Sequence, residues 1–413
     1  MNKKYVFLTD DIHPIGGEQL YVAGKAAYLA RNGWDVRIIF PGLNTGKCEI
    51  ECLQPYVVGG VRGIWRAPFK WGKMLSRIPL RRMLQIVGEC PSGSETIVES
   101  NTGELAQWGE LLASEIDARH VCLIVNEGFR EPEKTYDQVL DFFEFKLNRG
   151  ELYGITEKSL HLLFENYLKI ADGAAPSFNA VPMPAVQDIT DERLAVLDGK
   201  ADWTVCHIGR AAKGYVERMI RDMAKFASNH LDKKIRIVFV GAIESRRNVI
   251  ESAFGSLKNV EIIEMGNMVP IPRELYALVD VVVATSGCAV SSAAEGSMTV
   301  VADAGDGMSD GVLGVDTWSF LYREEGGLRE GFDETLDRVF MSPPSLPSNI
   351  ASVFQEDGDR EYANQLAQVR GLSSRREQYD CSRLYMPRAA LFDRAGSVLN
   401  SARISFGQFQ KTR

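Results

Sequence analysis

The chain has 413 residues, of which 45% are hydrophobic and 25% are charged, and its formal net charge at pH 7 is −8. This composition is typical of a folded globular protein with room for two or three domains. The acidic balance argues against nucleic acid as a general partner. The seven cysteines include no C-x-x-C pair, which argues against zinc and favours a reducing compartment. No stretch approaches the roughly 20 apolar residues of a membrane-spanning helix, so a cytoplasmic protein is expected.

The chain begins with a strand–helix–strand pattern. Residues 5–8 and 34–40 are short apolar segments typical of strands, and residues 18–32 fit an amphipathic helix. Gly16 and Gly17 lie just before that helix, where glycine lets a ligand approach the backbone and the helix N-terminus carries partial positive charge. A tight turn without a ligand would use the same two glycines, and both interpretations stay open.

Residues 62–82 form a basic and aromatic segment that contains no acidic residue. Its cations and tryptophans are Arg62, Trp65, Arg66, Lys70, Trp71, Lys73, Arg77, Arg81 and Arg82. In a chain of net charge −8, such a segment is typical of a surface that meets anionic lipid headgroups. The alternative is a solvated helix face whose aromatic side chains pack inward.

Two further strands are predicted at residues 95–99 and 120–125, followed by a largely helical region up to residue 172. His120 begins its strand, at the end away from any ligand, and a structural role is expected for it. Three prolines between residues 174 and 188 are typical of a connection between domains.

Five short, nearly all-apolar segments follow in the second half, at residues 204–208, 236–241, 260–265, 280–284 and 299–302. Because they alternate with helix-length amphipathic segments, they predict a parallel sheet covered on both faces. Ligands of such sheets bind beyond the carboxyl ends of the strands, where helix N-termini point unpaired N–H groups outward. The residues at these ends are Gly209, Arg210, Gly241, Ser286, Gly287 and Asp303. We therefore expect an anion site there.

The segments HIGRAAKG, RIVFVG, NVEIIEMGNM, LYALVDVVVATS and SSAAEG, in this order and spacing, resemble the nucleotide-binding half of glycosyltransferase family 4. The resemblance covers most of residues 1–40 and 200–315. Members of that family have the two-domain GT-B fold and transfer a sugar from a nucleotide donor with retention of anomeric configuration. The resemblance implies an α/β chain of GT-B architecture, with two Rossmann-like domains whose parallel sheets face a central cleft.

The resemblance also implies a division of the chain. An acceptor-binding domain of residues 1–180 is followed by a linker of residues 181–200. A nucleotide-sugar-binding domain then spans residues 201–378. Residues 379–413 are expected to form a C-terminal helix that crosses back to the first domain.

Arg210 and Lys213 are the candidate catalytic pair. Cations at a strand end can stabilise the charge that grows on a departing nucleotide diphosphate without a metal. Arginine donates to phosphate in a bidentate manner, and lysine supplies a mobile point charge. Solvated turn residues would show the same pattern.

The resemblance implies further contacts with the donor. Glu295 would accept hydrogen bonds from the ribose hydroxyls, and the alternative is an exposed glutamate at a helix end. Gly287 stands where the family has its first glutamate, so backbone N–H groups of Ser286 and Gly287 would serve instead. The remaining residues expected at the donor are Gly16, Gly17, Gly209, Gly241, Met268 and Gly307. The family's histidine near the sugar is replaced at strand ends by Ser100-Asn101 and Asn126-Glu127.

We predict a retaining, metal-independent glycosyltransferase of the hexosyltransferase type, which uses a nucleotide-diphosphate sugar as substrate and needs no cofactor. The acceptor would be a saccharide or lipid-linked glycan of a bacterial surface polysaccharide. The basic segment would bring the protein to the inner face of the cell membrane. Two alternatives stay open: a catalytically silent GT-B partner or scaffold, and a nucleotide-sugar epimerase of the same fold.

Overall fold

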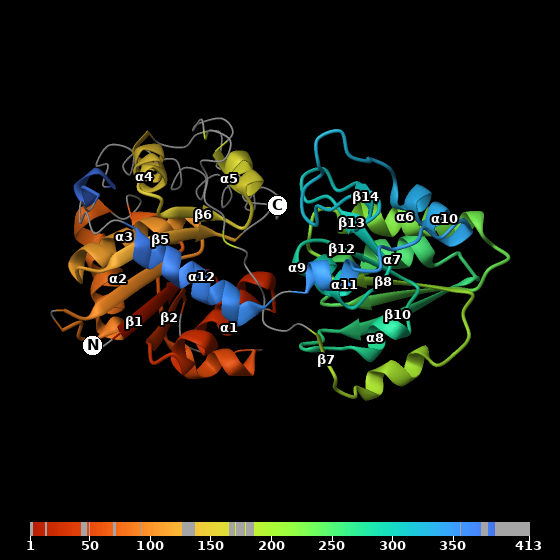
Figure 1. Cartoon of the computed structure of the whole chain (residues 1–413), viewed down its shortest axis with the longest axis horizontal. Coiled ribbons are helices and arrows are strands. Elements are labelled where there is room, and N and C mark those ends of the chain that lie inside the picture. Colours follow the sequence, from red (N-terminus) through yellow and green to blue (C-terminus); the bar gives the residue numbers. More distant parts are fainter. Residues whose placement is uncertain are drawn as a thin grey trace, which may run out of the picture. The chain divides into compact units, whose positions relative to one another are not determined.

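The computed structural model describes residues 3–12, 15–42, 48, 50–68, 72–91, 93–125, 137–164, 170, 178, 186–355, 357–372 and 379–384. The chain forms two compact units, one of residues 1–180 with 359–413 and the other of residues 181–358 (Figure 1). Residues 359–372 thus pack with the first unit, whereas the sequence led us to expect them in the second domain. Of the helix expected from residue 379 onward, only residues 379–384 are described, and they include the 3-10 helix η5 (Cys381–Leu384).

The first unit is built on six parallel strands in the order β3-β2-β1-β4-β5-β6. These strands are β1 (Lys3–Leu8), β2 (Asp35–Pro41), β3 (Val57–Val61), β4 (Glu95–Ser100), β5 (Arg119–Ile124) and β6 (Leu152–Gly154). The helices of this unit are α1 (Gly17–Arg31), η1 (Glu51–Tyr56), α2 (Gly72–Val87), α3 (Gly103–Glu115), α4 (Asp137–Asn148), α5 (Glu157–Phe164) and α12 (Gly358–Gly371). The four strands predicted for this half are confirmed, and β3 and β6 were not predicted.

The second unit has a six-stranded sheet in the order β10-β9-β8-β12-β13-β14, parallel except for the antiparallel edge strand β14. Its strands are β8 (Trp203–Ile208), β9 (Ile235–Val240), β10 (Val260–Gly266), β12 (Val281–Ala284), β13 (Thr299–Ala302) and β14 (Ser309–Val312). A separate parallel pair consists of β7 (Val186–Gln187) and β11 (Ile271–Pro272). The five predicted strands are confirmed, whereas β14 was not predicted as a strand.

Helices and 3-10 turns complete the second unit. They are η3 (Glu192–Leu197), α6 (Val216–Asn229), η4 (Glu244–Arg246), α7 (Arg247–Phe254), α8 (Glu274–Ala277), α9 (Gly287–Ala294), α10 (Phe332–Met341) and α11 (Ile350–Phe354). The turn η3 falls in the segment expected to be a linker. Its Leu194 and Leu197 are buried in the core of the second unit.

Both sheets grow outward in two directions from their first strand. In the first unit β1 lies between β2 and β4, and in the second β8 lies between β9 and β12. This is the doubly wound Rossmann order, in which the strand order reverses beside the first strand. Ligands of open α/β sheets bind in the crevice at this reversal, beyond the carboxyl ends of the strands. The fold therefore directs attention to the ends of β8 and β12.

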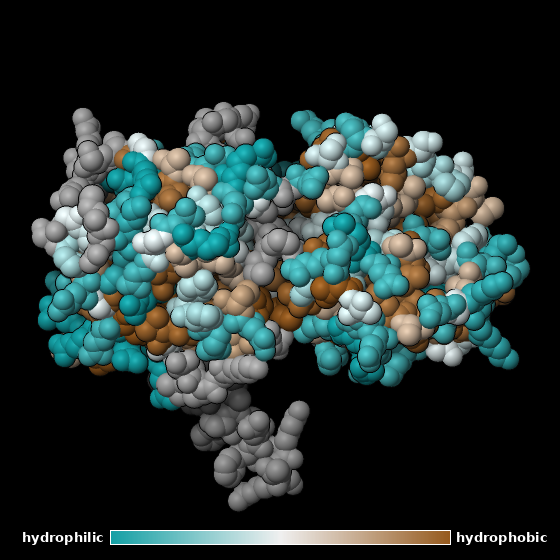
Figure 2. Space-filling view, turned by 60° about the horizontal axis from the view of Figure 1, so that its bottom comes forward, coloured by the Kyte–Doolittle hydropathy of each residue, from teal (hydrophilic) through white to brown (hydrophobic). Residues whose placement is uncertain are grey.

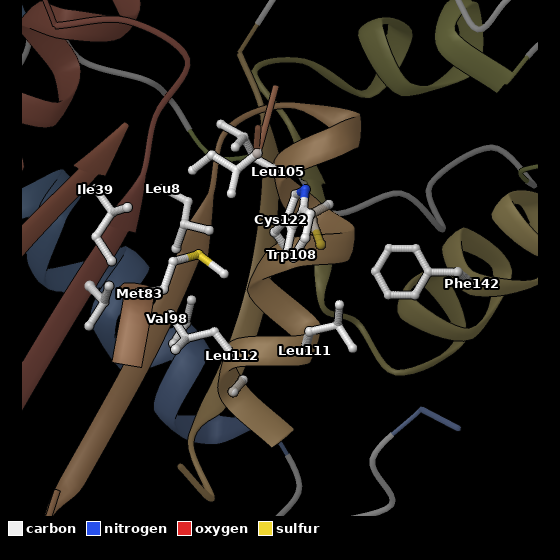
Figure 3. Packing of buried hydrophobic residues seen from close by; sticks show 14 of the residues in the cluster. Leu8, Ile39, Met83, Val98, Leu105, Trp108, Leu111, Leu112, Cys122 and Phe142 are labelled. Carbon is white, nitrogen blue, oxygen red and sulfur yellow. The ribbon is translucent and has the colours of Figure 1, made fainter. Parts of the chain in front are cut away.

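The core of the first unit lies between its sheet and the helices that cover it. Figure 3 shows Trp108 and Leu112 of α3 beside Met83 of α2 and the strand residues Leu8 and Val98. All five side chains are fully buried. The indole N–H of Trp108 donates to the carbonyl oxygen of Arg66 over 2.8 Å, which anchors the turn after β3 to α3.

On the face viewed in Figure 2, hydrophilic residues predominate, and apolar areas lie between them on both units. In the part of the chain that the structure describes, no helix has both the length and the hydrophobicity needed to cross a bilayer.

A fully buried ion pair joins α1 to β4 in the first unit. Lys25 Nζ lies 2.6 Å from Glu99 Oε2, and both side chains are excluded from solvent. The hydroxyl groups of Tyr5 and Tyr21 donate to the same carboxylate over 2.5 and 3.0 Å. Tyr21 also contacts the side-chain oxygen of Gln365 on α12, at 3.1 Å. One carboxylate thus connects β1, α1 and β4 and, through Tyr21, the returning helix.

Replacing Lys25 with methionine should destabilise the protein by about 3–5 kcal/mol, because the change leaves the Glu99 charge buried without its cation. The exposed pair Arg31–Asp359, in the same unit, provides a control. Arg31→Met should cost no more than about 1 kcal/mol, because solvent screens an exposed pair. Urea unfolding followed by circular dichroism measures both. Equal losses of unfolding free energy in Lys25→Met and Arg31→Met would contradict a structural role for the buried pair.

Candidate functional site

The backbone is crowded at the carboxyl ends of β8 and β9. Gly209 and Gly241 follow these strands and adopt φ of 151° and 128°. A Cβ atom on Gly241 would lie 2.3 Å from the carbonyl oxygen of Gly209, closer than any real side chain could sit. Glycine is therefore required here because two chain segments approach each other, and backbone rather than side chains lines this part of the edge.

The two expected cations stand in the turn that follows Gly209. Arg210 is exposed, and its guanidinium has no hydrogen-bond or ion-pair partner among the described residues. Lys213 is half-buried, and its backbone N–H donates to the carbonyl of Arg210 over 3.2 Å. The same turn thus carries both side chains, and α6 begins three residues later at Val216.

Ser286 and Gly287 reach the same edge from β12. In the sheet, His207 pairs with Val283, so Arg210 and Ser286 each stand three residues beyond a paired position. Ser286 has φ of 59° and ψ of −140°, a strained conformation for a residue with a side chain, and its N–H donates to the carbonyl of Phe320 over 2.6 Å. The helix α9 starts at Gly287, and its first N–H groups have no partner within the helix.

Two buried polar atoms at this edge lack a hydrogen-bond partner within the described part of the chain: Nε2 of His207 and Oγ1 of Thr285. His207 is fully buried, and its Nδ1 lies 3.0 Å from the carbonyl oxygen of Val283. Burial, together with the positive charge of Lys213, lowers the pKa of His207 to about 4. The neutral ring donates through Nδ1, so Nε2 remains an acceptor suited to a hydroxyl group.

Gly307 lies against the start of α6. It has φ of 71°, and a Cβ atom there would lie 3.2 Å from Cα of Tyr215. The ring of Tyr215 stands edge-on to His207, with centroids 5.8 Å apart. The turn between β13 and β14 therefore closes over the same loop that carries Arg210 and Lys213.

The two acidic residues of that turn, Asp303 and Asp306, have hydrogen-bond or ion-pair partners within the second unit. Asp306 lies 2.8 Å from Nη1 of Arg323 and 2.8 Å from Nε of Arg329. Hydrogen bonding to Arg323 holds the pKa of Asp306 well below its usual range. Asp303 accepts from the backbone N–H groups of Gly305 and Asp306 over 2.8 and 2.7 Å, which fixes the turn.

Asp310 on β14 lies in an environment that raises the pKa of its carboxyl, whereas the pKa of Asp306 is lowered. Its side chain is 1% exposed and lies 2.8 Å from Nε of Arg323. Burial, and next the neighbouring Asp303 carboxylate, raise the pKa of Asp310 to about 7 despite the attraction of Arg323.

Two further residues expected at the donor are Met268 and Glu295. Met268 is 3% exposed and packs in the core of the second unit. Glu295 directly follows α9, a helix of eight residues that spans about 12 Å, so it lies at the other end of this helix from Gly287. Its carboxylate lies 2.9 Å from Nε of Arg273. A contact between Glu295 and ribose stays a prediction.

In the first unit, Gly16 and Gly17 stand at the start of α1, with Gly16 extended at φ −161°. The Glu18 carboxylate connects this helix start to the loop after β1, because it accepts from Thr9 Oγ1 over 2.6 Å and from the Asp10 N–H over 3.1 Å. At the end of β4, Asn101 is fully buried, and neither of its amide atoms has a partner in the described part.

His120 lies in a buried hydrogen-bonded cluster. Its Nε2 is 3.0 Å from Ser100 Oγ, and its Nδ1 is 2.8 Å from Glu110. A Cβ atom on Gly109 would lie 2.2 Å from Ser100 Oγ, so α3 seals the pair from solvent. These contacts support the structural role expected for His120.

The basic segment is only partly described. Arg62, Trp65 and Arg66 are exposed on the turn after β3, and Lys73 is exposed on α2. Lys70, Trp71 and the dipeptide Asn126-Glu127 lie outside the described residues. Within the described ranges, no group of three or more histidine, cysteine or acidic side chains is placed to hold a metal ion.

Sequence reasoning did not single out His207 or Thr285. Both stand at the ends of apolar strands and look like ordinary strand residues. The available signal was a histidine inside an otherwise apolar run that leads into a glycine–arginine turn.

No protein-family model matches this chain, and no curated protein sequence matches it. Solved structures do. HepE from Anabaena, in complex with UDP and glucose, is similar over 96% of this chain and 99% of its own, with a TM-score of 0.54 and 15% identity. A glycosyltransferase from Rickettsia africae is similar over 89% and 96%, with a TM-score of 0.54 and 15% identity.

A putative UDP-N-acetylglucosamine 2-epimerase from Listeria monocytogenes is similar over 92% of this chain and 99% of its own, with a TM-score of 0.51 and 12% identity. At such identities the likeness concerns the fold. The fold class expected from the sequence, α/β of GT-B type with two Rossmann-like units, is confirmed.

The raised pKa of Asp310 predicts a pH dependence of stability. Because its folded pKa of about 7 exceeds the unfolded value near 4, the folded state binds the extra proton between these values. Stability from this group therefore falls as pH rises through that window. When the pH is raised from 5 to 8, the free energy of unfolding of Asp310→Asn should increase by about 1–3 kcal/mol relative to that of the wild type.

Urea unfolding of both proteins at the two pH values measures this gain. The exposed Asp232 provides the control. Asp232→Asn should differ from the wild type by the same amount at both pH values. If the difference in unfolding free energy between Asp310→Asn and the wild type is also the same at both pH values, the raised pKa of Asp310 is contradicted.

Proposed function

We propose that the second unit binds a nucleotide-diphosphate sugar at the carboxyl edge of its sheet, and that the protein is a retaining glycosyltransferase. One observation carries the proposal. At the strand-order reversal, Arg210 and the start of α9 stand at the same sheet edge, and within the described residues Arg210, His207 Nε2 and Thr285 Oγ1 have no partner. Buried polar atoms without partners are rare in folded proteins and call for an explanation, which a bound ligand supplies.

The cations suit the diphosphate. Arg210 offers a planar pair of donors to phosphate oxygens, and Lys213 adds a second positive charge from the same turn. The first N–H groups of α9 at Gly287 add fixed dipoles. As the bond between the sugar and the diphosphate breaks, negative charge grows on the leaving oxygen, and groups held in place around it lower the barrier.

The neutral His207 suits the uncharged part of the ligand. Its Nε2 can only accept a hydrogen bond, which a sugar or ribose hydroxyl can donate. Burial is the main reason that the pKa of His207 is low and its ring neutral, and the charge of Lys213 lowers that pKa further.

In the proposed reaction, the bond between the sugar's anomeric carbon and the phosphate oxygen breaks, and a bond to the acceptor oxygen forms on the same face. The acceptor hydroxyl passes its proton to the departing phosphate oxygen, so no dedicated base is required. The acceptor, a saccharide or lipid-linked glycan, would bind the first unit. There the amide of Asn101 offers both a donor and an acceptor to hydroxyl groups.

Epimerisation of a nucleotide sugar is the second candidate, favoured by the likeness to the Listeria epimerase-like structure. It would use the same diphosphate site but would form no bond to an acceptor. A catalytically silent binding protein of the same fold would also keep the site.

Incubation with UDP-glucose or UDP-N-acetylglucosamine should distinguish these candidates. A transferase should release UDP slowly without acceptor and faster with a suitable saccharide acceptor, and the release should persist in excess chelator because Arg210 and Lys213 take the place of a metal. An epimerase should instead convert UDP-N-acetylglucosamine to its 2-epimer while the total nucleotide sugar stays constant. Chromatography of the nucleotides reads out both. Binding without either reaction would contradict the enzymatic proposal.

Arg210→Ala should weaken UDP binding by about 1.5–3 kcal/mol, roughly 10- to 150-fold, because it removes a charge-assisted donor pair. Arg221 lies exposed on α6 in the same unit, where it pairs with Glu217, and provides the matched control. Arg221→Ala should leave the affinity unchanged. Titration calorimetry measures both, with thermal midpoints as the test of folding. Equal affinities for wild type and Arg210→Ala would move the diphosphate site away from this turn.

A further inference from the structure

The solvent-facing side of α2 combines large apolar side chains with a row of cations. Met74 is 79% exposed and Ile78 is 69% exposed, values unusual for residues of this kind. The exposed cations of the same helix are Lys73, Arg77, Arg81 and Arg82. The opposite side of α2 carries the buried residues Leu80, Met83, Ile86 and Val87, which belong to the core. Met74 and Ile78 therefore do not contribute to the core of the first unit.

The arrangement around the helix is ordered. At 100° per residue, Met74 and Ile78 fall at the middle of the exposed arc, with Lys73 and Arg77 on one side and Arg82 on the other. Arg81 and the exposed Gln85 fall within the same middle part of the arc, next to Met74 and Ile78. Apolar side chains among cations on one exposed helix face are typical of helices that lie in the plane of a lipid interface, where the apolar residues enter the acyl boundary and the cations meet the headgroups.

The turn before α2 continues this surface. Trp65 is 54% exposed, and the guanidinium of Arg66 lies over its ring at 4.2 Å from the centroid. Arg62 is exposed on the same turn. Tryptophan is a side chain that the membrane interface favours. The hydrogen bond from Trp108 to the carbonyl of Arg66 holds this turn against the unit.

Acidic side chains are sparse around this surface. Residues 62–88 contain none. From the neighbouring η5 segment, Asp380 lies near enough to Lys73 for the lysine to contribute to lowering the pKa of that carboxyl, after the hydrogen bonds from Ser382. Arg383 in the same segment is exposed and is paired with Asp141 over 3.1 Å. The surface therefore keeps a strong positive charge on a chain whose net charge is −8.

We propose that the exposed face of α2, together with the turn of residues 62–66, docks on an anionic lipid surface. Headgroup phosphates would meet the flanking cations, and Met74, Ile78 and Trp65 would enter the interface. An acidic protein partner would also bind the cations. It would, however, offer no apolar phase to the two exposed aliphatic side chains in the middle of this basic face. This docking does not depend on the nucleotide site.

Co-sedimentation of the full chain with vesicles tests the proposal. The wild type should bind vesicles made of equal parts phosphatidylglycerol and phosphatidylcholine, and it should bind vesicles of pure phosphatidylcholine far less. Salt should weaken the binding to the anionic vesicles. Each cation near an anionic surface strengthens binding about fivefold, so Arg77→Gln/Arg81→Gln/Arg82→Gln should lower the partition coefficient about 100-fold. Met74→Gln/Ile78→Gln should remove the binding that persists in high salt.

A matched control changes three exposed lysines of the second unit. Lys200→Gln/Lys234→Gln/Lys258→Gln alters the net charge equally and should retain vesicle binding. Unchanged thermal midpoints show that each variant is folded. Equal binding of the wild type to both kinds of vesicle, binding to neither, or an equal loss in the control would overturn the proposal.

Discussion

A parallel sheet that grows in both directions from its first strand must place the crossover helices of one direction on one face and those of the other direction on the opposite face. In the second unit, α6 and α7 accordingly pack in one core and α9 packs in another. Where the two directions part, the loops after neighbouring strands diverge and leave backbone exposed at the sheet edge. In the second unit this place lies between β8 and β12. On the other side of β8, Gly209 and Gly241 bring the backbone after β8 and β9 so close together that no side chain fits at Gly241.

Charge is distributed unevenly along that edge. In the β13–β14 turn, Asp306 is paired with Arg323 and Arg329, and Asp303 accepts hydrogen bonds from backbone N–H groups. Glu295 is likewise paired with Arg273. Arg210, by contrast, has no partner among the described residues. The local excess of positive charge therefore depends on the turn after β8, although the chain as a whole is acidic.

The sequence predicted the strands well because buried parallel strands are short apolar runs with clear limits. It failed for β14, where Asp310 and Gly311 look like a loop and only pairing with β13 makes them a strand. It also assigned residues 359–372 to the second domain, because the helical pattern of α12 says nothing about which sheet it packs on. At the site, the glycine–arginine turn was visible in the sequence. The orphaned atoms of His207 and Thr285 were not, because a missing partner is a property of three-dimensional packing.

The return of α12 to the first unit has a consequence for how the protein is made. Tyr362 and Gln365 complete the packing around Tyr21, yet they are separated from it by the whole second unit, residues 181–358. At 5–20 residues per second, a ribosome needs on the order of ten to forty seconds to add that segment. During this interval the outer surface of α1 lacks its cover on the nascent chain, while the second unit can already close. The first unit to be synthesised is thus the last to be completed.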